Sequence, residues 1–185
     1  MNLIDKSGIS IYGDYSKPLM ENLKMAKMQG VKLENLVLNN ESLRGADLAF
    51  LNFNGSDFLH CDFSRSNFNN SSFKNACLNH CSFSYCDLSG VDFSGSDLKY
   101  CNFFGANLKD ANFDEAKLNF VIPNGIEIKG VFIDELPAVW TKDRFFLGCK
   151  DFSAKELHRA LPLLRERYGD KALYCYEYLK KNKEF

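Results

Sequence analysis

The chain has 185 residues, of which 45% are hydrophobic and 25% charged, and its net charge is −1. This length allows one or two small domains with a packed core, and the balanced charge predicts neither nucleic-acid nor membrane-surface binding. No apolar run approaches the roughly 20 residues that a membrane-spanning helix needs. The seven cysteines form no CxxC pair, and the start MNLIDKSGISIYG has no signal-peptide core. We therefore expect free thiols and a cytoplasmic location.

The first predicted element is a short helix within SKPLMENLKMAKMQG, residues 16–30. Pro18 suits the first turn of a helix, and Gly30 can end it. Leu23 and Met28 also fit the five-residue spacing of the segment that follows, so a degenerate repeat is the alternative. We favour the helix, as a cap on the next domain.

Residues 31–120 place a large apolar residue at every fifth position, without a break. The eighteen central positions are all Leu or Phe: Leu33, Leu38, Leu43, Leu48, Phe53, Phe58, Phe63, Phe68, Phe73, Leu78, Phe83, Leu88, Phe93, Leu98, Phe103, Leu108, Phe113 and Leu118. A period of five fits neither a helix nor a strand, and a sustained exact period indicates a repeat architecture. A mostly small residue stands two positions before each centre, and Asp or Asn is the commonest residue one position before it.

The consensus Ala/Cys/Ser–Asp/Asn–Leu/Phe–x–x resembles the pentapeptide-repeat family, most closely in SLRGADL (42–48) and GANLKDANF (105–113). The resemblance implies a right-handed quadrilateral β-helix with four repeats per coil and with the central and small side chains inside. Eighteen repeats then make about 4.5 coils, and residues 20 apart stack at roughly the 4.8 Å spacing of neighbouring strands. We expect Asp and Asn to bond to the turn backbone, and glycines two positions after a centre to form corners.

The repeat pattern ends at Pro123. Alternation in residues 125–149 predicts strands, with turns near Gly130 and near Lys142–Asp143. The segment SAKELHRALPLLRERYG, residues 153–169, starts with a capping box and predicts a helix that Pro162 kinks or splits. A last helix is expected over residues 170–183.

The predicted fold class is therefore all-β, a quadrilateral β-helix with additions at both ends. Its domains are an N-terminal helical cap (1–30), the repeat β-helix (31–120) and an α+β C-terminal extension (121–185). The extension resembles the tails of uncharacterised bacterial and phage members of the family.

One side of the predicted tube is too apolar for a free surface. Its outward positions include Val37, Leu59, Cys77, Tyr100 and Phe120, and the extension is rich in Tyr, with Tyr168, Tyr174, Tyr176 and Tyr178. We expect the extension or a second chain to cover this side, so a homodimer is one prediction. The candidate tail-docking or dimer surface is Val37, Leu59, Tyr100, Phe120, Tyr174 and Tyr178.

Two groups of residues could carry chemistry. Cys61, Cys81 and Cys101 form one predicted column, and His60 and His80 precede two of these cysteines. Neighbouring strand residues point to opposite faces, so the thiols and imidazoles should not converge on a metal. His158 and Glu156 lie on a predicted helix with no nucleophile motif nearby. We therefore expect no catalytic residue, no metal, no cofactor and no enzymatic activity.

The function that the resemblance implies is protein binding. Some members of the family are DNA mimics, whose acidic rod occupies the DNA-binding saddle of a type II topoisomerase. Residues 31–120 carry eleven acidic and seven basic residues, and the candidate partner-binding acidic surface is Asp47, Asp57, Asp62, Asp87, Asp92, Asp97 and Asp110. The simpler reading is that these Asp residues form turns. The alternatives are a phage or bacterial accessory protein that binds another target through the extension, and a small enzyme that uses the extension.

Overall fold

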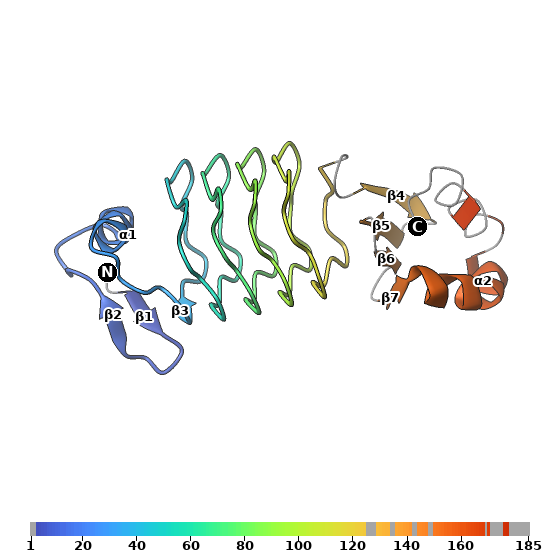
Figure 1. The fold of residues 1–185 in the computed structure, drawn as a ribbon, viewed down its shortest axis with the longest axis horizontal. Helices are drawn as coiled ribbons and strands as arrows, with labels where there is room; N and C mark the ends of the chain where they lie inside the picture. The colour runs from blue at the N-terminus through green and yellow to red at the C-terminus, as the bar shows by residue number, and fades with distance from the viewer. Residues whose placement is uncertain are drawn as a thin grey trace.

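The computed structural model describes residues 3–124, 129–133, 136–141, 144–147, 150–168, 170 and 176–177. Figure 1 shows a row of stacked coils between an N-terminal cap and a C-terminal sheet and helix. In the described part of the chain, no helix is both long enough and apolar enough to cross a membrane.

The N-terminal cap contains the predicted helix. Helix α1 (Leu19–Met28) occupies the predicted segment, so these residues are not a degenerate repeat. Leu23 is buried in the core whereas Met28 is 72% exposed, so this pair does not continue the buried central positions of the repeat despite its five-residue spacing.

The cap also contains two strands that the sequence analysis did not predict. Strands β1 (Leu3–Asp5), β2 (Ser10–Tyr12) and β3 (Leu36–Val37) form an antiparallel sheet in the order β2-β1-β3. Strand β3 belongs to the first coil, so its pairing with β1 covers part of a coil edge that would otherwise be open to other strands.

The coils are held together by a regular backbone ladder. Parallel bridges join residues 20 apart, from Val37 with Asp57 to Asn102 with Ile122, so four repeats make one coil. The Leu38 N–H donates to the Asp57 carbonyl at 2.9 Å, and the Asp57 N–H donates to the Leu36 carbonyl at 2.9 Å. This pattern recurs along the rod and confirms the predicted stacking of each coil on the next.

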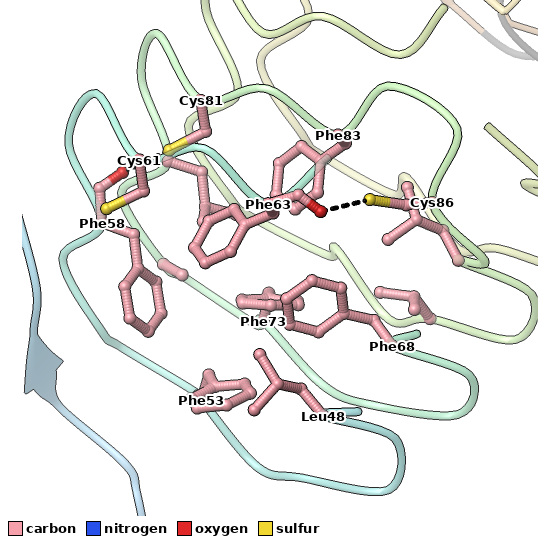
Figure 2. Close-up of a cluster of buried hydrophobic side chains, with 14 of the residues drawn as sticks. Leu48, Phe53, Phe58, Cys61, Phe63, Phe68, Phe73, Cys81, Phe83 and Cys86 are labelled. Atoms are coloured by element: carbon pink, nitrogen blue, oxygen red, sulfur yellow. Dashed lines mark hydrogen bonds between the residues drawn. The ribbon is translucent and has the colours of Figure 1, made fainter. Parts of the chain in front are cut away.

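The Leu and Phe centres fill the axis of the tube, as predicted. Seventeen of the eighteen are buried, and Phe113 in the last coil is partly buried. Rings in one column stack, as between Phe63 and Phe83 with centroids 5.2 Å apart, and rings of opposite sides meet edge to face across the axis, as between Phe83 and Phe93 at 5.8 Å. Figure 2 shows this cluster around Phe68 and Phe73. Each such ring pair contributes about 0.5–1.5 kcal/mol beyond area burial.

The small residues before the centres close the remaining space and also satisfy carbonyls. The Cys86 thiol donates to the Phe63 carbonyl of the preceding coil at 2.9 Å (Figure 2). The Ser66 hydroxyl donates to the Leu43 carbonyl at 2.6 Å in the equivalent position. This position therefore favours a small side chain that can also donate a hydrogen bond, not merely one that is small enough to fit.

The corner residue, two positions after each centre, has a left-handed backbone in every repeat. All eighteen corner residues from Asn35 to Phe120 have φ between 54° and 68°. Only five of them are glycine, and Gly55 has an additional reason, because a Cβ atom there would lie 2.6 Å from Asn35 Oδ1. The predicted glycine corners are correct, but most corners carry a side chain on a strained backbone.

The extension contains four strands and a helix. Strands β4 (Lys129–Ile133), β5 (Leu136–Trp140), β6 (Arg144–Leu147) and β7 (Lys150–Ser153) form an antiparallel sheet in chain order, and α2 (Ala154–Tyr168) follows. At the start of α2, the Ser153 N–H donates to the Glu156 carboxylate at 2.8 Å, which is half of a capping box.

The structure corrects the predicted turn at Gly130 and rules out one of the two outcomes predicted for Pro162. Gly130 lies inside β4, paired with Val139, so it is not a turn, and a glycine in mid-strand gave the misleading signal. Helix α2 continues past Pro162, so the predicted split does not occur, and the kink, the alternative outcome, stays a prediction. The predicted turn at Lys142–Asp143 and most of the predicted helix over 170–183 lie outside the described residues.

Candidate protein-binding surface

The most regular feature of the outer surface is a ladder of stacked rings along one corner of the rod. It consists of His60, His80, Tyr100 and Phe120, which occupy the same corner in successive coils. Their ring centroids are 4.7, 4.5 and 4.9 Å apart, and their planes are within 16° of parallel. We call these four residues the aromatic ladder.

The repeat itself explains why the ladder forms. Coils stack at about 4.8 Å, and a corner in the left-handed region directs its side chain outward. Rings at the same corner of successive coils therefore meet at a distance close to that of stacked aromatic pairs. The left-handed backbone of each ring residue costs on the order of 1 kcal/mol, and stacking offsets part of this cost. Tyr100 remains 47% exposed.

The side of the rod that precedes the ladder is the one that the sequence analysis expected to be covered. Val37, Leu59 and Cys77 are half-buried there. Part of the cover over Val37 is strand β1, which pairs with it through Ile4, so the cover at this point is not the extension. We call this side together with the aromatic ladder the ladder side.

The described part of the extension does not lie along the ladder side. In Figure 1, strands β4–β7 and helix α2 lie beyond the last coil, at the end of the rod. Tyr174 and Tyr178, the extension residues predicted to dock here, lie outside the described residues. Docking of a second chain on the ladder side stays a prediction.

The histidine pair in the ladder cannot chelate a metal in this conformation. A metal ion lies in the plane of each imidazole that binds it, but the His60 and His80 planes are 16° from parallel and their centroids 4.7 Å apart. One ion therefore cannot lie in both planes. Among the described residues, no group of three metal-binding side chains comes together.

The cysteine column points into the rod, away from the histidines. The thiols of Cys61, Cys81 and Cys101 donate to backbone carbonyls of the preceding coil, at 2.9, 2.6 and 2.9 Å. Burial raises the pKa of Cys81 and Cys101, and it raises the pKa of Cys86 to about 12. The thiols of Cys81, Cys86 and Cys101 are therefore protonated structural groups with little nucleophilic character.

The seven predicted acidic residues do not form one continuous surface. Five of them pair with a cation: Asp47 with Lys27, Asp57 with Lys6, Asp62 with Arg44, Asp92 with Lys74 and Asp97 with Lys99, at 2.8–3.2 Å. The Lys27 hydrogen bond and ion pair hold the pKa of Asp47 below its ordinary value. The remaining two, Asp87 and Asp110, have no cation partner among the described residues, and Asp87 accepts bonds from the Ser89 N–H and hydroxyl at 3.1 and 2.6 Å.

Many of these carboxylates have the turn role that the sequence suggested as the simpler reading. The side-chain oxygen of Asp62 accepts the Ser64 N–H at 3.0 Å, and that of Asp92 accepts the Ser94 N–H at 2.9 Å. Asn102 makes the same contact with the Phe104 N–H at 2.9 Å. Asp and Asn are thus used interchangeably before the centre, because both accept this bond.

The extension brings together few groups that could do chemistry. His158 Nδ1 lies 2.6 Å from the Tyr176 hydroxyl, a pair that the sequence analysis did not predict. Glu156 is committed to Ser153 in the capping box, with a 2.7 Å bond from the Ser153 hydroxyl. A cavity of about 460 Å³ is lined by Leu161, Pro162, Arg165 and Glu166. Among the described residues, no nucleophile–base pair lines this cavity.

Two family models match the chain. One describes a pentapeptide repeat region and matches residues 52–135, and the other describes pentapeptide repeats in eight copies and matches residues 26–58. Together they cover residues 26–135, which is more than half of the chain. The chain belongs to the pentapeptide-repeat family, as the sequence pattern indicated.

Several solved structures are similar to part of this chain. HetL, a pentapeptide repeat protein involved in heterocyst differentiation regulation in Nostoc sp. strain PCC 7120, is 24% identical, with 48% of this chain and 40% of HetL covered and a TM-score of 0.47. Rfr23 from Cyanothece 51142 is 19% identical, with 56% and 94% covered and a TM-score of 0.42. QnrB1, a plasmid-mediated fluoroquinolone resistance protein, is 24% identical, with 49% and 47% covered and a TM-score of 0.36.

The matched region spans less than half the length of HetL and of QnrB1. No curated protein matches this chain.

Proposed function

We propose that the protein is a non-catalytic, cytoplasmic scaffold that binds a protein partner through its ladder side. The observation that supports this most is the aromatic ladder itself, four stacked rings held on the outside of a rigid rod. Aromatic side chains are enriched at the centres of protein interfaces, where they supply most of the binding energy.

The ladder is already ordered before any partner binds. Tyr100 stacks on both His80 and Phe120, and its N–H donates to the Asn119 carbonyl at 3.0 Å. A partner therefore has little side-chain entropy to remove on binding, and preorganisation of this kind improves affinity.

The test compares two tyrosines that share backbone geometry. Tyr100 and Tyr85 both have a left-handed backbone, with φ of 60° and 57°, and both are about half exposed, but only Tyr100 belongs to the ladder. Asn tolerates this backbone, so Tyr100→Asn removes the ring without breaking the corner, and Tyr85→Asn is the matched control. Each protein is used for quantitative affinity purification from native lysate.

We expect a partner that wild type and Tyr85→Asn retain equally and that Tyr100→Asn loses by at least tenfold. Retention of the same proteins in equal amounts by all three would contradict the proposal. Equal loss with both variants would also contradict it, because the ladder would then have no special role.

DNA mimicry directed at a DNA-handling enzyme such as a type II topoisomerase is a second candidate. It is favoured by three acidic residues that lie on one side of the rod in different coils. Asp47 and Asp87 stand one position before the central residue, and Asp110 is the corner residue of that side. Sustained negative potential is what such mimicry needs, and Lys27 neutralises Asp47. Supercoiling assays with added protein test it: inhibition at micromolar protein that Asp87→Lys abolishes supports mimicry, and no inhibition argues against it.

A further inference from the structure

We propose that one occupant of the ladder side is a second copy of this chain, lying antiparallel to the first about a two-fold axis at the middle of the ladder. The inference rests on the proposed function, because it names a partner for the same surface. It is carried by the order of chemical groups along the ladder side, which is self-complementary in one direction only.

The ladder has two imidazoles at its N-terminal end and two six-membered rings at its C-terminal end. A two-fold axis between the levels of His80 and Tyr100 places each His80 opposite Tyr100 of the second copy, and each His60 opposite Phe120 of the second copy. The ring edges of the two copies face each other, and an imidazole N–H of one copy can donate to the Tyr100 hydroxyl of the other.

The charges beside the ladder favour the same direction. The outward column of this side runs from Asp57 through Cys77 and Asp97 to Lys117. The axis that centres the ladder also centres this column, so Asp57 lies opposite Lys117 of the second copy, and the pair occurs twice. Parallel copies would oppose like charges, which is unfavourable.

Both charged groups are available for such a contact. Lys6 binds Oδ1 of Asp57 at 2.8 Å, and the other carboxylate oxygen can accept from a second cation. Lys117 is exposed and forms no ion pair with any residue in the described ranges.

The size of the surface limits the strength of the association. The ladder spans three ring-to-ring steps of 4.5–4.9 Å, and a stable interface buries about 800 Å² on each partner. A strip of this length is smaller than that, so we expect a reversible dimer with a dissociation constant on the order of 100 µM.

The experiment is sedimentation equilibrium of the full chain over a wide concentration range, from roughly ten times below to five times above that constant. Wild type and Tyr85→Asn should dimerise equally, and Tyr100→Asn should weaken the dimer at least tenfold. Asp57→Lys and Lys117→Asp should each weaken it at least tenfold, and the double variant D57K/K117D should restore it to within about threefold. Thermal melting of each variant checks that it is folded.

Three results would overturn the inference: a monomer at every concentration, a dimer that Tyr100→Asn leaves intact, or a double variant no better than the singles. A dimer that Tyr100→Asn leaves intact would form through another surface, such as the extension. A monomer that still captures a Tyr100-dependent partner would refute the antiparallel dimer and leave the proposed function standing. A dimer that behaves as predicted, with no captured protein, would support the inference and refute binding of a different partner.

Discussion

Replacing Phe83 by Ala tests the packing of the rod at its centre. Phe83 is fully buried. It stacks on Phe63 and Phe103, with centroids 5.2 and 5.4 Å apart, and meets Phe73 and Phe93 edge to face at 6.2 and 5.8 Å. The substitution therefore removes ring contacts with the coils on both sides.

The expected loss follows from burial and from the cavity that remains. Truncating a buried Phe to Ala costs about 3–5 kcal/mol, and the rod cannot easily collapse around the cavity because its backbone ladder fixes the spacing between coils. For a chain of this length, each kcal/mol lowers the melting temperature by roughly 2–4 °C. We therefore expect Phe83→Ala to lower the melting temperature by roughly 6–20 °C.

Two further substitutions serve as controls for this measurement. Phe83→Leu should cost only about 1–2 kcal/mol, because Leu fills the same position in other repeats. Phe104→Ala removes a ring that is 55% exposed, and we expect a change within about 1 kcal/mol. Thermal and urea unfolding, followed by circular dichroism, measure all three. Similar losses for Phe83→Ala and Phe104→Ala would refute the packing described above.

The remaining predictions concern thiols, corners and acidity. Iodoacetamide should label Cys77 in the native protein but label the buried Cys61, Cys81, Cys86 and Cys101 only after unfolding; mass spectrometry detects this, and native labelling of the buried four would contradict their inward orientation. Gly55→Ala should cost about 1 kcal/mol more than Gly45→Ala, because only Gly55 faces Asn35, and Asn35→Ala should remove that difference in urea unfolding. The pKa of Asp47 is lowered in the folded state, so its stabilising effect is present above the ordinary value of 3.8 and is lost as the pH falls through the folded pKa. Melting temperatures between pH 7 and pH 3 should therefore fall less for Asp47→Asn than for wild type, and an equal fall would argue against the ion pair with Lys27.

The sequence predicted the rod because its signal repeats. Leu78 or Phe83 alone is uninformative, but eighteen Leu or Phe residues at one spacing admit few backbones. The same regularity could have predicted some ion pairs, since Arg44 with Asp62 and Lys74 with Asp92 have the same separation in the sequence. It could also have predicted the aromatic ladder, because its members occupy the same corner position in successive coils.

Features outside the repeat could not be derived in this way. Strand β1 pairs with Leu36 and Val37, which lie far from it in the sequence, and such short strands give no periodic signal. Lys6 and Lys27 reach acidic residues of the rod only because the cap folds over its end. Tertiary contacts of this kind leave no pattern in a single sequence.

The central claim is that the ladder side is where the protein meets its partner. The most direct measurement is the affinity of a partner captured by wild type, determined by isothermal titration calorimetry against wild type, Tyr100→Asn and Tyr85→Asn. We predict that affinity falls at least tenfold for Tyr100→Asn alone. The same dissociation constant for all three proteins would place the binding surface elsewhere.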